Sequence, residues 1–481
     1  MSPRKQPSCL LKLCIKSSLN LINECCYIIE KNNSDLECRE CERQVVALKG
    51  YLMSLLPARL FDVLCLERGC CRYRGDPRIQ LNVLIHPKMS IFRKSDVDNG
   101  IAQNFWARVI PCFSRLVVLD LKFICTDEIL EIIGSQCLLL EELNIVSRVD
   151  ICKSLINASV LIRNVSDAGL CCIANLNNLR ILSMDPPRNE RARRVGRCVS
   201  QAGIIMLISK LPYLEELHIE SCDIGSTLIG TDISIGPLSL RKINYLFASA
   251  EGMRKLVKIC PHLKELCITH LSAHNKDSIL EEIALSDLRL HKLDMSFYSH
   301  SDSLHRLLQV KGSYITHFSL WEIDHSLSLD SVINLGMCCP NLTSLCLMTQ
   351  SKYLLIPRFF RHPGNIFCKL EILTLGDENF SIEDILVFFL DCTKCMRKLT
   401  LKFETKLVID NTLRYILQKG YLKNLNILWL DCTLEVSKQV VKEVIQGCEM
   451  LQNFTVNFTE DMSDVYKYIA DNNLDFNLGS Y

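Results

Sequence analysis

The sequence predicts an α/β solenoid, with a parallel sheet on its concave face and helices on its convex face. The first observation is a short apolar run, L-x-x-L-x-L, that recurs along most of the chain. The second is an amphipathic helical pattern between successive copies of this run. The third is the length, because 481 residues exceed the size at which one compact core usually stops growing. An elongated array of repeats accounts for all three.

The apolar run occurs thirteen times, and most copies start 23 to 29 residues after the previous one. Intervals of 39 and 35 residues precede the copies at Leu179 and Leu214. This period is typical of leucine-rich repeats. The copies start at Leu116, Leu140, Leu179, Leu214, Leu240, Leu263, Leu290, Ile315, Leu342, Leu370, Met396, Leu425 and Leu451.

Each copy predicts one short strand. Side chains alternate between the faces of a strand, so the first, fourth and sixth positions of the run can line a core. The helical segments between the strands start with Asp or Ser, which cap helix N-termini; examples are DEILEIIGSQC, DSILEEIAL, EDILVFFLDC and SKQVVKEVIQGC. One strand and one helix per repeat predict a curved, right-handed horseshoe.

Cysteine recurs three residues before the first leucine of several copies, and proline follows it twice. The cysteines at this position are Cys137, Cys260, Cys339 and Cys448, and those near it are Cys112, Cys368 and Cys395. The segments GSQCLLLEELNI, CPHLKELCI and CPNLTSLCL resemble the cysteine-containing leucine-rich repeats that are common in F-box proteins and related ligase receptors. The resemblance covers roughly residues 110–460. We expect the small thiol to close the turn from helix to strand, where a larger group would clash.

The 27 cysteines would suggest a disulfide framework in a secreted chain, but their number is odd and many lie inside apolar runs. Free cysteine behaves as a small buried hydrophobe, which indicates a reducing compartment. Near the N-terminus, Lys12 and Lys16 interrupt the apolar residues, so we expect an amphipathic helix and not a signal peptide. No window approaches the roughly 20 apolar residues of a membrane span. The expected location is cytoplasmic, nuclear or both.

Lysine and arginine total 55, against 54 acidic residues. This balance gives no net field toward nucleic acid or an anionic membrane, so neither is an expected partner. One basic segment, PPRNERARRVGR at residues 186–197, interrupts the repeats. It predicts an exposed loop, which is either a nuclear-import or acidic-partner site or a solvated insertion.

Residues 1–70 lack the repeat and predict two helical segments around a polar middle, KNNSDLECRECERQ. The first segment, SCLLKLCIKSSL, places Cys14 four residues after Leu10. This spacing resembles the Leu-x-x-x-Cys box with which substrate receptors of cullin-RING ubiquitin ligases bind elongin C. The resemblance implies that Leu10 and Cys14 contact elongin C. Such a box usually ends in an aliphatic residue four positions after the cysteine; this chain has Ser18 there, and Leu19 replaces it only if the helix rotates or its register slips.

The second segment, SLLPARLFDVL, contains Leu56, Pro57, Leu60 and Leu64. Proline before hydrophobes at helical spacing predicts a helix that starts at Pro57 and has one apolar stripe. A hydrophobe and a proline before two further hydrophobes are similar to the cullin box of the same receptors. The resemblance implies that these four residues face a cullin.

Two other interpretations of residues 1–70 stay open. The Leu-Pro-x-x-Leu run also resembles the start of an F-box, which docks on a Skp-type adaptor. An F-box continues into a helical second half, whereas LERGCCRYRGDPRIQ turns polar, so elongin is the preferred adaptor. Alternatively, both helices only cap the first repeat, since the ends of a repeat array need a polar cover. The other expected divisions are a connecting segment or irregular first repeat at 71–110, repeats at 111–460 and a C-terminal cap at 461–481.

The sequence contains little that suggests catalysis. Cys38 with Cys41 and Cys392 with Cys395 form C-x-x-C pairs, but neither has a well-spaced second pair, so no metal is expected. There is no phosphate-binding loop, no nucleophile elbow and no H-E-x-x-H zinc helix. We therefore expect neither enzyme activity nor a cofactor.

Two columns of side chains are predicted to line the concave face, because strand residues between the buried positions point away from the core. The first column comprises Asp120, Asn144, Ser183, His218, Asn244, Cys267, Asp294, Ser319, Cys346, Thr374, Thr400, Trp429 and Thr455. The second, two positions further on, comprises Lys122, Asp185, Glu220, Thr269, Ser296, Trp321, Met348, Lys402, Asp431 and Asn457.

From these columns, the expected substrate-binding residues are His218, Asp294, Trp321, Lys402, Trp429 and Asp431. The preferred anchors are the two tryptophans, because tryptophan is enriched at interface hot spots. The other explanation is that each ring packs on the side chain of a neighbouring strand, without a ligand.

Together these features predict a substrate-recognition subunit of a cullin-RING E3 ubiquitin ligase. Its repeats would bind a protein target, and its N-terminal helices would bind elongin C or a Skp-type adaptor and a cullin. Catalysis would then come from proximity to the conjugating enzyme and not from this chain. The alternative is a leucine-rich-repeat scaffold or inhibitor with no ligase connection.

Overall fold

The computed structural model forms two compact units: an N-terminal unit, Pro7–Asn244, and a C-terminal unit, Tyr245–Tyr481 with Met1–Gln6. The residues that the structure describes are 8–33, 38–68, 73, 75–94, 98, 101–122, 124–146, 165–184, 199–219, 225, 229, 236–246, 249–269, 276–298, 301–323, 328–349, 366–377, 382–403, 407–431, 433–457, 461–472 and 477–479. The basic segment 186–197 lies outside these residues.

The N-terminal unit starts with helices where the sequence lacks the repeat. These helices are α1 (Ser8–Asn32), α2 (Arg39–Leu55), α3 (Ala58–Glu67) and α4 (Pro77–Leu84). The predicted polar middle, residues 31–44, is itself partly helical, because α2 begins inside it at Arg39. Cys38 caps α2 by accepting a hydrogen bond from the backbone N–H of Cys41 at 3.3 Å, and acidic residues in the first turn favour the helix start. Helix α3 starts at Ala58, one residue later than predicted, with Pro57 as its N-cap.

Repeats fill the rest of the N-terminal unit. The strands are β1 (Ile91–Arg93), β2 (Val118–Asp120), β3 (Glu142–Asn144), β4 (Ile181–Met184) and β5 (Glu216–Ile219), and β6 (Lys242–Leu246) spans the end of the unit. The helices between them are α5 (Gln103–Val109), α6 (Asp127–Gln136), α7 (Asp167–Ile173) and α9 (Gln201–Lys210), with a 3-10 turn, η3 (Ile110–Cys112).

The C-terminal unit continues the same alternation. Its strands are β7 (Glu265–Thr269), β8 (Lys292–Ser296), β9 (His317–Ile323), β10 (Ser344–Thr349), β11 (Ile372–Asp377), β12 (Lys398–Phe403), β14 (Ile427–Leu430), β16 (Asn453–Thr455) and β17 (Asn477–Gly479), and β13 (Leu407–Val408) pairs with β15 (Leu434–Glu435) in a separate sheet. Its helices are α11 (Ala250–Ile259), α12 (Lys276–Leu285), α13 (Asp302–Lys311), α14 (Leu329–Cys338), α15 (Ile382–Cys392), α16 (Asp410–Gln418), α17 (Lys438–Gly447) and α18 (Ser463–Asp471), with a 3-10 turn, η5 (Gly312–Tyr314).

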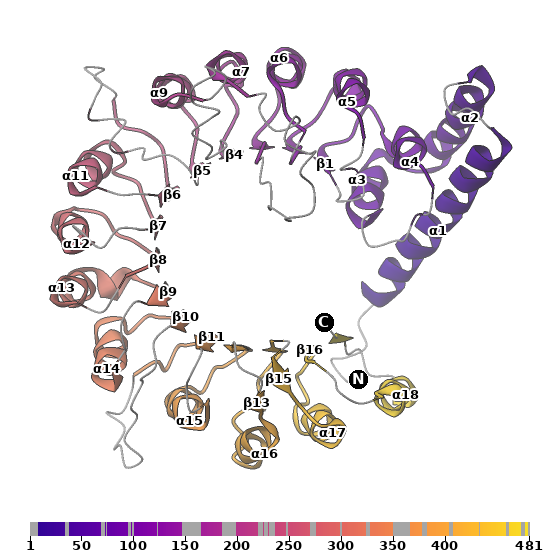
Figure 1. Cartoon of the computed structure of the whole chain (residues 1–481). Helices are drawn as coiled ribbons and strands as arrows, with labels where there is room; N and C mark the ends of the chain where they lie inside the picture. The colour runs from indigo at the N-terminus through magenta and orange to yellow at the C-terminus, as the bar shows by residue number, and fades with distance from the viewer. Residues whose placement is uncertain are drawn as a thin grey trace, which may run out of the picture. The chain divides into compact units, whose positions relative to one another are not determined.

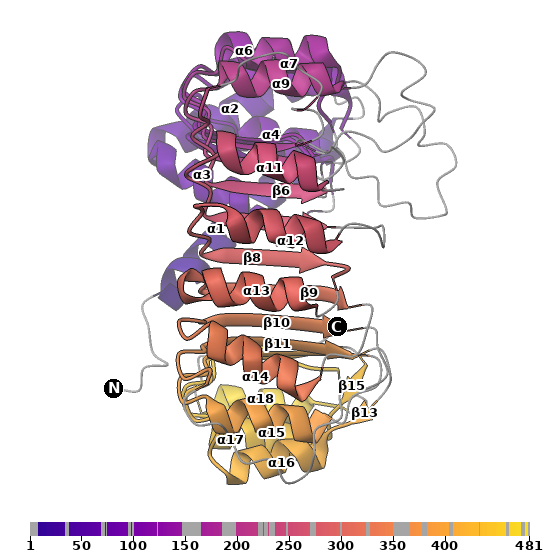
Figure 2. The ribbon, with the colours of Figure 1, turned by 90° about the vertical axis from the view of Figure 1, so that its left-hand side faces the viewer.

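The predicted fold class, an α/β leucine-rich-repeat solenoid, is confirmed. The strands of the main sheet follow one another in sequence order, and their pairing is parallel. Every predicted copy of the apolar run yields one strand, which starts two residues after the first residue of the copy. In each unit the strands lie on the inner side of the curve and the helices on its outer side (Figure 1). Within the C-terminal unit, α11, α12, α13 and α14 are stacked beside their strands (Figure 2).

The core of each repeat consists of the three motif positions. At β8, for example, Leu290 just before the strand and Leu293 and Met295 within it have no exposed surface, while Lys292 and Asp294 are partly exposed. This alternation is the one that a half-buried strand requires. Burying a leucine-sized side chain contributes about 1.5–3 kcal/mol, so thirteen copies give the array its main stabilising energy.

Where a cysteine stands three residues before the motif, it closes the turn from helix to strand, as expected. At α11, the backbone N–H of Cys260 donates to the carbonyl of Leu256, and the carbonyl of Cys260 accepts from Leu263. The C-caps of α6, α11, α14 and α17 are Cys137, Cys260, Cys339 and Cys448, and all are buried. Burial raises the pKa of Cys137 to about 11 and of Cys260 to about 12, so these thiols stay protonated.

Neighbouring helices are joined at their N-termini by a repeated carboxylate contact. Asp127 at the start of α6 accepts hydrogen bonds from the backbone N–H and hydroxyl of Ser166, the N-cap of α7, at 2.7 and 2.6 Å. Equivalent contacts join Asp167 to Ser200, Asp277 to Ser301, and Asp410 to Ser437. Each carboxylate thus fixes the N-cap of the following helix and sets the spacing of the repeats.

None of the described helices combines the length and apolar character needed to cross a membrane.

Candidate functional site

Helix α1 has two apolar faces that differ in burial. The inner face packs on the other N-terminal helices and comprises Ile15, Leu19, Ile22, Cys26 and Ile29. The outer stripe of α1 is exposed and comprises Leu11, Cys14, Leu21 and Ile28. Its three large side chains, Leu11, Leu21 and Ile28, are 61%, 63% and 57% exposed. Aligned apolar side chains on a preformed helix are the usual way in which a helix enters a groove of a partner.

The predicted elongin box lies partly on this outer stripe. Leu10 belongs to α1, but its side chain lies outside the described residues. Cys14 is exposed, and so is Ser18. Leu19 has no exposed surface, so it does not replace the missing aliphatic residue at position 18. The next exposed hydrophobe after Cys14 is Leu21, one heptad further along the helix.

The predicted cullin helix, α3, is mostly part of the core. Leu64 has no exposed surface, Leu56 and Leu60 are half-buried, and Pro57 is exposed. The role of Leu64 as a cullin contact is therefore not compatible with this structure. The reason is the position of α3, which packs against α1, α4 and β1.

Polar contacts fix α3 to the first strand. The carboxylate of Asp62 accepts hydrogen bonds from the backbone N–H and hydroxyl of Ser90 at 3.1 and 2.7 Å, next to the start of β1. At the end of α3, the guanidinium of Arg68 forms a bidentate pair with Asp98, with one bond of 2.9 Å, and both side chains are fully buried. A buried pair of this kind holds its geometry because either charge alone would be costly to bury.

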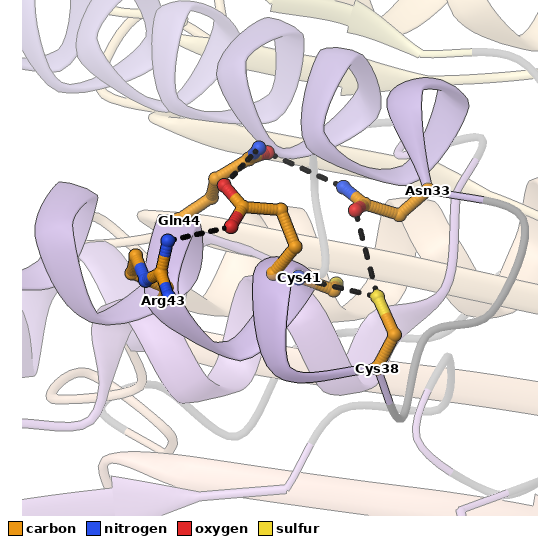
Figure 3. A network of polar contacts seen from close by, with 6 residues as sticks. Asn33, Cys38, Cys41, Arg43 and Gln44 are labelled. Carbon is orange, nitrogen blue, oxygen red and sulfur yellow. Dashed lines mark hydrogen bonds and ion pairs between the residues drawn. The ribbon is translucent and has the colours of Figure 1, made fainter.

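A hydrogen-bond network joins the end of α1 to the start of α2 (Figure 3). The amide of Asn33 donates to the carbonyl of Ile29 at 2.6 Å and to Gln44 at 3.2 Å, and its oxygen accepts from the Cys38 thiol at 3.6 Å. Cys38 thus acts as a helix cap and Cys41 is buried, so the first C-x-x-C pair has a structural role here. Among the described residues, no three His, Cys, Asp or Glu side chains are arranged to hold a metal ion.

The second candidate surface is the concave face of the C-terminal unit. Strand pairing brings the first predicted column into register across eight neighbouring strands, from β7 to β16. The aligned residues are Cys267, Asp294, Ser319, Cys346, Thr374, Thr400, Trp429 and Thr455. Side chains far apart in the sequence are therefore neighbours on this face.

Three predicted residues meet in what we call the tryptophan–lysine cluster: Trp321, Lys402 and Trp429. The Nζ atom of Lys402 lies 6.0 Å from the ring centroid of Trp321 and 5.6 Å from that of Trp429. Contacts of this kind contribute about 0.5–1 kcal/mol each at exposed sites. Trp321 and Trp429 are 38% and 37% exposed, so part of each side chain lies on the surface of the concave face.

Gly376 lies beside this cluster. It occupies the second-column position on β11, between Met348 on β10 and Lys402 on β12. A Cβ atom there would lie 2.3 Å from the terminal carbon of Met348 and 2.8 Å from the backbone carbonyl oxygen of Lys402. The missing side chain therefore leaves the space that the Met348 side chain occupies. Sequence reasoning did not single out Gly376, although a glycine inside a strand pattern signals a close approach.

The other predicted binding residues lie outside this cluster. Asp294 on β8 pairs with Lys292 at 3.0 Å, and Asp431 follows β14 and donates its backbone N–H to the carbonyl of Leu401. His218 lies on β5 of the N-terminal unit, 3.3 Å from Glu216. Burial and the nearby charge of Lys242 lower the pKa of His218, so this imidazole is neutral at physiological pH.

Leu21 and Ile28 are candidate partner contacts that sequence reasoning missed. Their signal was present, because Cys14, Leu21 and Ile28 are spaced by seven residues, the period at which side chains recur on one face of a packed helix. The predicted elongin box ends at Ser18, so it does not include Leu21 or Ile28.

Comparison with known proteins shows little beyond the fold. No family model and no curated protein matches this sequence. A crystal structure of the Rad7 and Elc1 complex in yeast is similar over 94% of this chain and 95% of that chain, with 13% identity and a TM-score of 0.48. A structure of the Toll–Spatzle complex, a molecular hub in Drosophila development and innate immunity, is similar over 81% of this chain and 46% of that chain, with 10% identity and a TM-score of 0.31. At these values, neither likeness carries an argument about function.

Proposed function

We propose that this chain is a substrate-recognition subunit of a cullin-RING ubiquitin ligase and binds an elongin-type adaptor through the outer stripe of α1. The observation that carries the proposal is the exposure of Cys14, Leu21 and Ile28 on a helix whose opposite face is already packed. Exposed, aligned hydrophobes on a rigid helix favour a protein partner, because monomeric proteins rarely leave such surface uncovered. Cys14 lies four residues after Leu10, as in the predicted elongin box, and Leu21 and Ile28 extend the stripe beyond that box.

In this proposal the two predicted boxes have unequal roles. Helix α3 supports α1 and closes the first repeat through Leu64, Asp62 and Arg68. Of the four predicted cullin residues, the exposed Pro57 and the half-buried Leu56 and Leu60 would remain available to a cullin. The chain would act by holding a target near the conjugating enzyme and would contribute no catalytic group. Buried free thiols fit a reducing compartment, so we place the chain in the cytoplasm, the nucleus or both.

The test is co-purification of the full chain with elongin C, with a Skp-type adaptor and with a cullin. We expect elongin C to be retained, to be lost with Cys14→Asp/Leu21→Asp, and to be unaffected by Trp429→Ala on the concave face. Retention of a Skp-type adaptor in place of elongin C would mean that the receptor uses a Skp-type adaptor. Binding of neither adaptor to the wild-type chain would overturn the ligase assignment.

The alternative, a repeat scaffold without a ligase, is favoured by one observation. The packing of α3 against β1 is what a cap on the first repeat requires. A scaffold would bind its target through the concave face and leave α1 without an adaptor. The same co-purification separates the two functions, because only the receptor retains both an adaptor and a cullin.

A further inference from the structure

The tryptophan–lysine cluster contains a cation, Lys402, for which the described part of the chain supplies no ion pair. Among the described residues, no carboxylate forms an ion pair with Lys402 or with Lys398, two residues earlier on the same face of β12. The pairs on nearby strands are different, since Lys292 is bound by Asp294. An unpaired ammonium group between two half-exposed rings is available to an incoming acceptor.

The surroundings of Lys402 favour an anionic and partly apolar ligand. The described concave side chains of β11, β12 and β14 include Lys398 and Lys402, with Asp431 just after β14 as the acid on this side. Ile372 and Ile427 flank Lys398 in register and are half-exposed. A cation beside exposed aromatic and aliphatic surface fits a carboxylate that is followed by an apolar side chain.

The sheet beside the cluster is shielded from water at Thr400 on β12. Thr400 is 3% exposed, and its hydroxyl has no hydrogen-bond partner among the described residues. Two strands away in the same column, burial raises the pKa of Cys346 to about 12, with smaller opposing effects from Asp294, which raises it, and Lys402, which lowers it. A salt bridge formed beside a shielded part of the sheet is screened less by water than one on an open surface.

We propose that the tryptophan–lysine cluster binds an extended acidic segment of a protein target, with an Asp or Glu carboxylate on Lys402 and an adjacent apolar side chain between Trp321 and Trp429. This inference deepens the proposed function, because it names the chemistry of the target that the receptor holds. The proposed ligand group is a carboxylate side chain. Binding of a phosphorylated segment or of a nucleic acid in its place would contradict the proposal.

The test uses a displayed library of random dodecapeptides. Peptides are selected for binding to the full wild-type chain, without adaptor, and the same selection is made on the Lys402→Met variant for comparison. We expect peptides enriched on the wild-type chain to carry Asp or Glu beside an aromatic or aliphatic residue. Replacing that acid by its amide should weaken binding about tenfold or more. Raising the salt from about 0.1 M to about 1 M, which shortens the Debye length from about 10 Å to about 3 Å, should also weaken it. Lys122→Met, which removes a lysine paired with Asp120 in the N-terminal unit, is the matched control and should retain binding.

Intrinsic fluorescence gives an independent readout. The chain has three tryptophans, and Trp106 is fully buried in the N-terminal unit, so a change on peptide binding reports Trp321 or Trp429. The proposal is overturned if enriched peptides lack acids, if they bind Lys402→Met equally, or if nothing is enriched over that variant. The peptide selection contains no adaptor. A negative peptide selection therefore says nothing about adaptor binding, and a negative adaptor co-purification says nothing about peptide binding.

Discussion

Helices α1 and α3 carry similar apolar patterns, and both are predicted from the sequence to contact a ligase subunit. In the structure, the two helices differ in how much of this apolar surface is buried. Helix α1 leaves one of its two apolar faces exposed, with Leu21 63% exposed, whereas α3 places Leu64 in the core with no exposed surface. The difference lies in their neighbours, because α3 is short and packs on α1, α4 and β1, while α1 is long and is covered on one side. An apolar stripe therefore identifies a contact surface, but not whether the contact is made within the chain.

The largest effect is expected from removing the buried cation at the end of α3. Arg68→Ala removes the guanidinium that pairs with the buried Asp98, so we expect a loss of about 3–5 kcal/mol in the free energy of unfolding. Urea denaturation measures this loss. Arg68→Met combined with Asp98→Leu removes both charges and should recover most of it. A change below about 1 kcal/mol for Arg68→Ala would contradict the burial of this pair.

A matched leucine pair on α3 tests which of its faces is core. Leu64→Ala should destabilise the chain by about 2–5 kcal/mol, because it leaves a cavity. Leu66→Ala, at a residue that is 42% exposed, should change stability by about 0.5 kcal/mol or less. Chemical denaturation of both variants gives the comparison. Equal effects would mean that α3 is not packed as described.

Neighbouring residues on α1 give the converse comparison. Leu21→Asp should leave the free energy of unfolding within about 0.5 kcal/mol of wild type and weaken adaptor binding about tenfold or more. Ile22→Ala, one residue later on the inner face, should lower stability and act on binding only through unfolding. Calorimetric titration of the adaptor and thermal unfolding separate the two effects. Wild-type affinity in Leu21→Asp would remove the outer stripe from the interface.

Thiol labelling should distinguish the faces of α1 without changing stability. Cys14 is exposed, whereas burial raises the pKa of Cys26 to about 12, with smaller contributions from Cys25 and Glu30. Because the thiolate is the reactive form and Cys26 stays protonated at pH 9, labelling at that pH should modify the exposed Cys14 and spare Cys26. Peptide mapping by mass spectrometry reads both sites. Labelling of Cys26 as fast as Cys14 in the folded chain would contradict the packing of α1, and adaptor binding should protect Cys14.

The predictions that held rest on strong periodic signals. Each copy of the apolar run forms a strand, because three aligned hydrophobes specify both the face and the register of that strand. The cysteines before the motif are buried helix C-caps, but leucine takes the same position at Leu211, the C-cap of α9, so the expected clash of a larger group is wrong. The predictions that failed depend on contacts made by other segments. The burial of Leu19 and Leu64 and the start of α2 at Arg39 are examples.

The sequence by itself determined the repeat, its strands and the order of side chains along the concave face, because these follow from local periodicity. Only the tertiary structure decided which apolar stripe stays exposed on α1, that Leu64 belongs to the core, and that Lys402 lies between Trp321 and Trp429. These outcomes depend on which surfaces meet after folding. For the cluster, strand pairing is decisive, because it brings Lys402 on β12 within reach of Trp321 on β9 and Trp429 on β14.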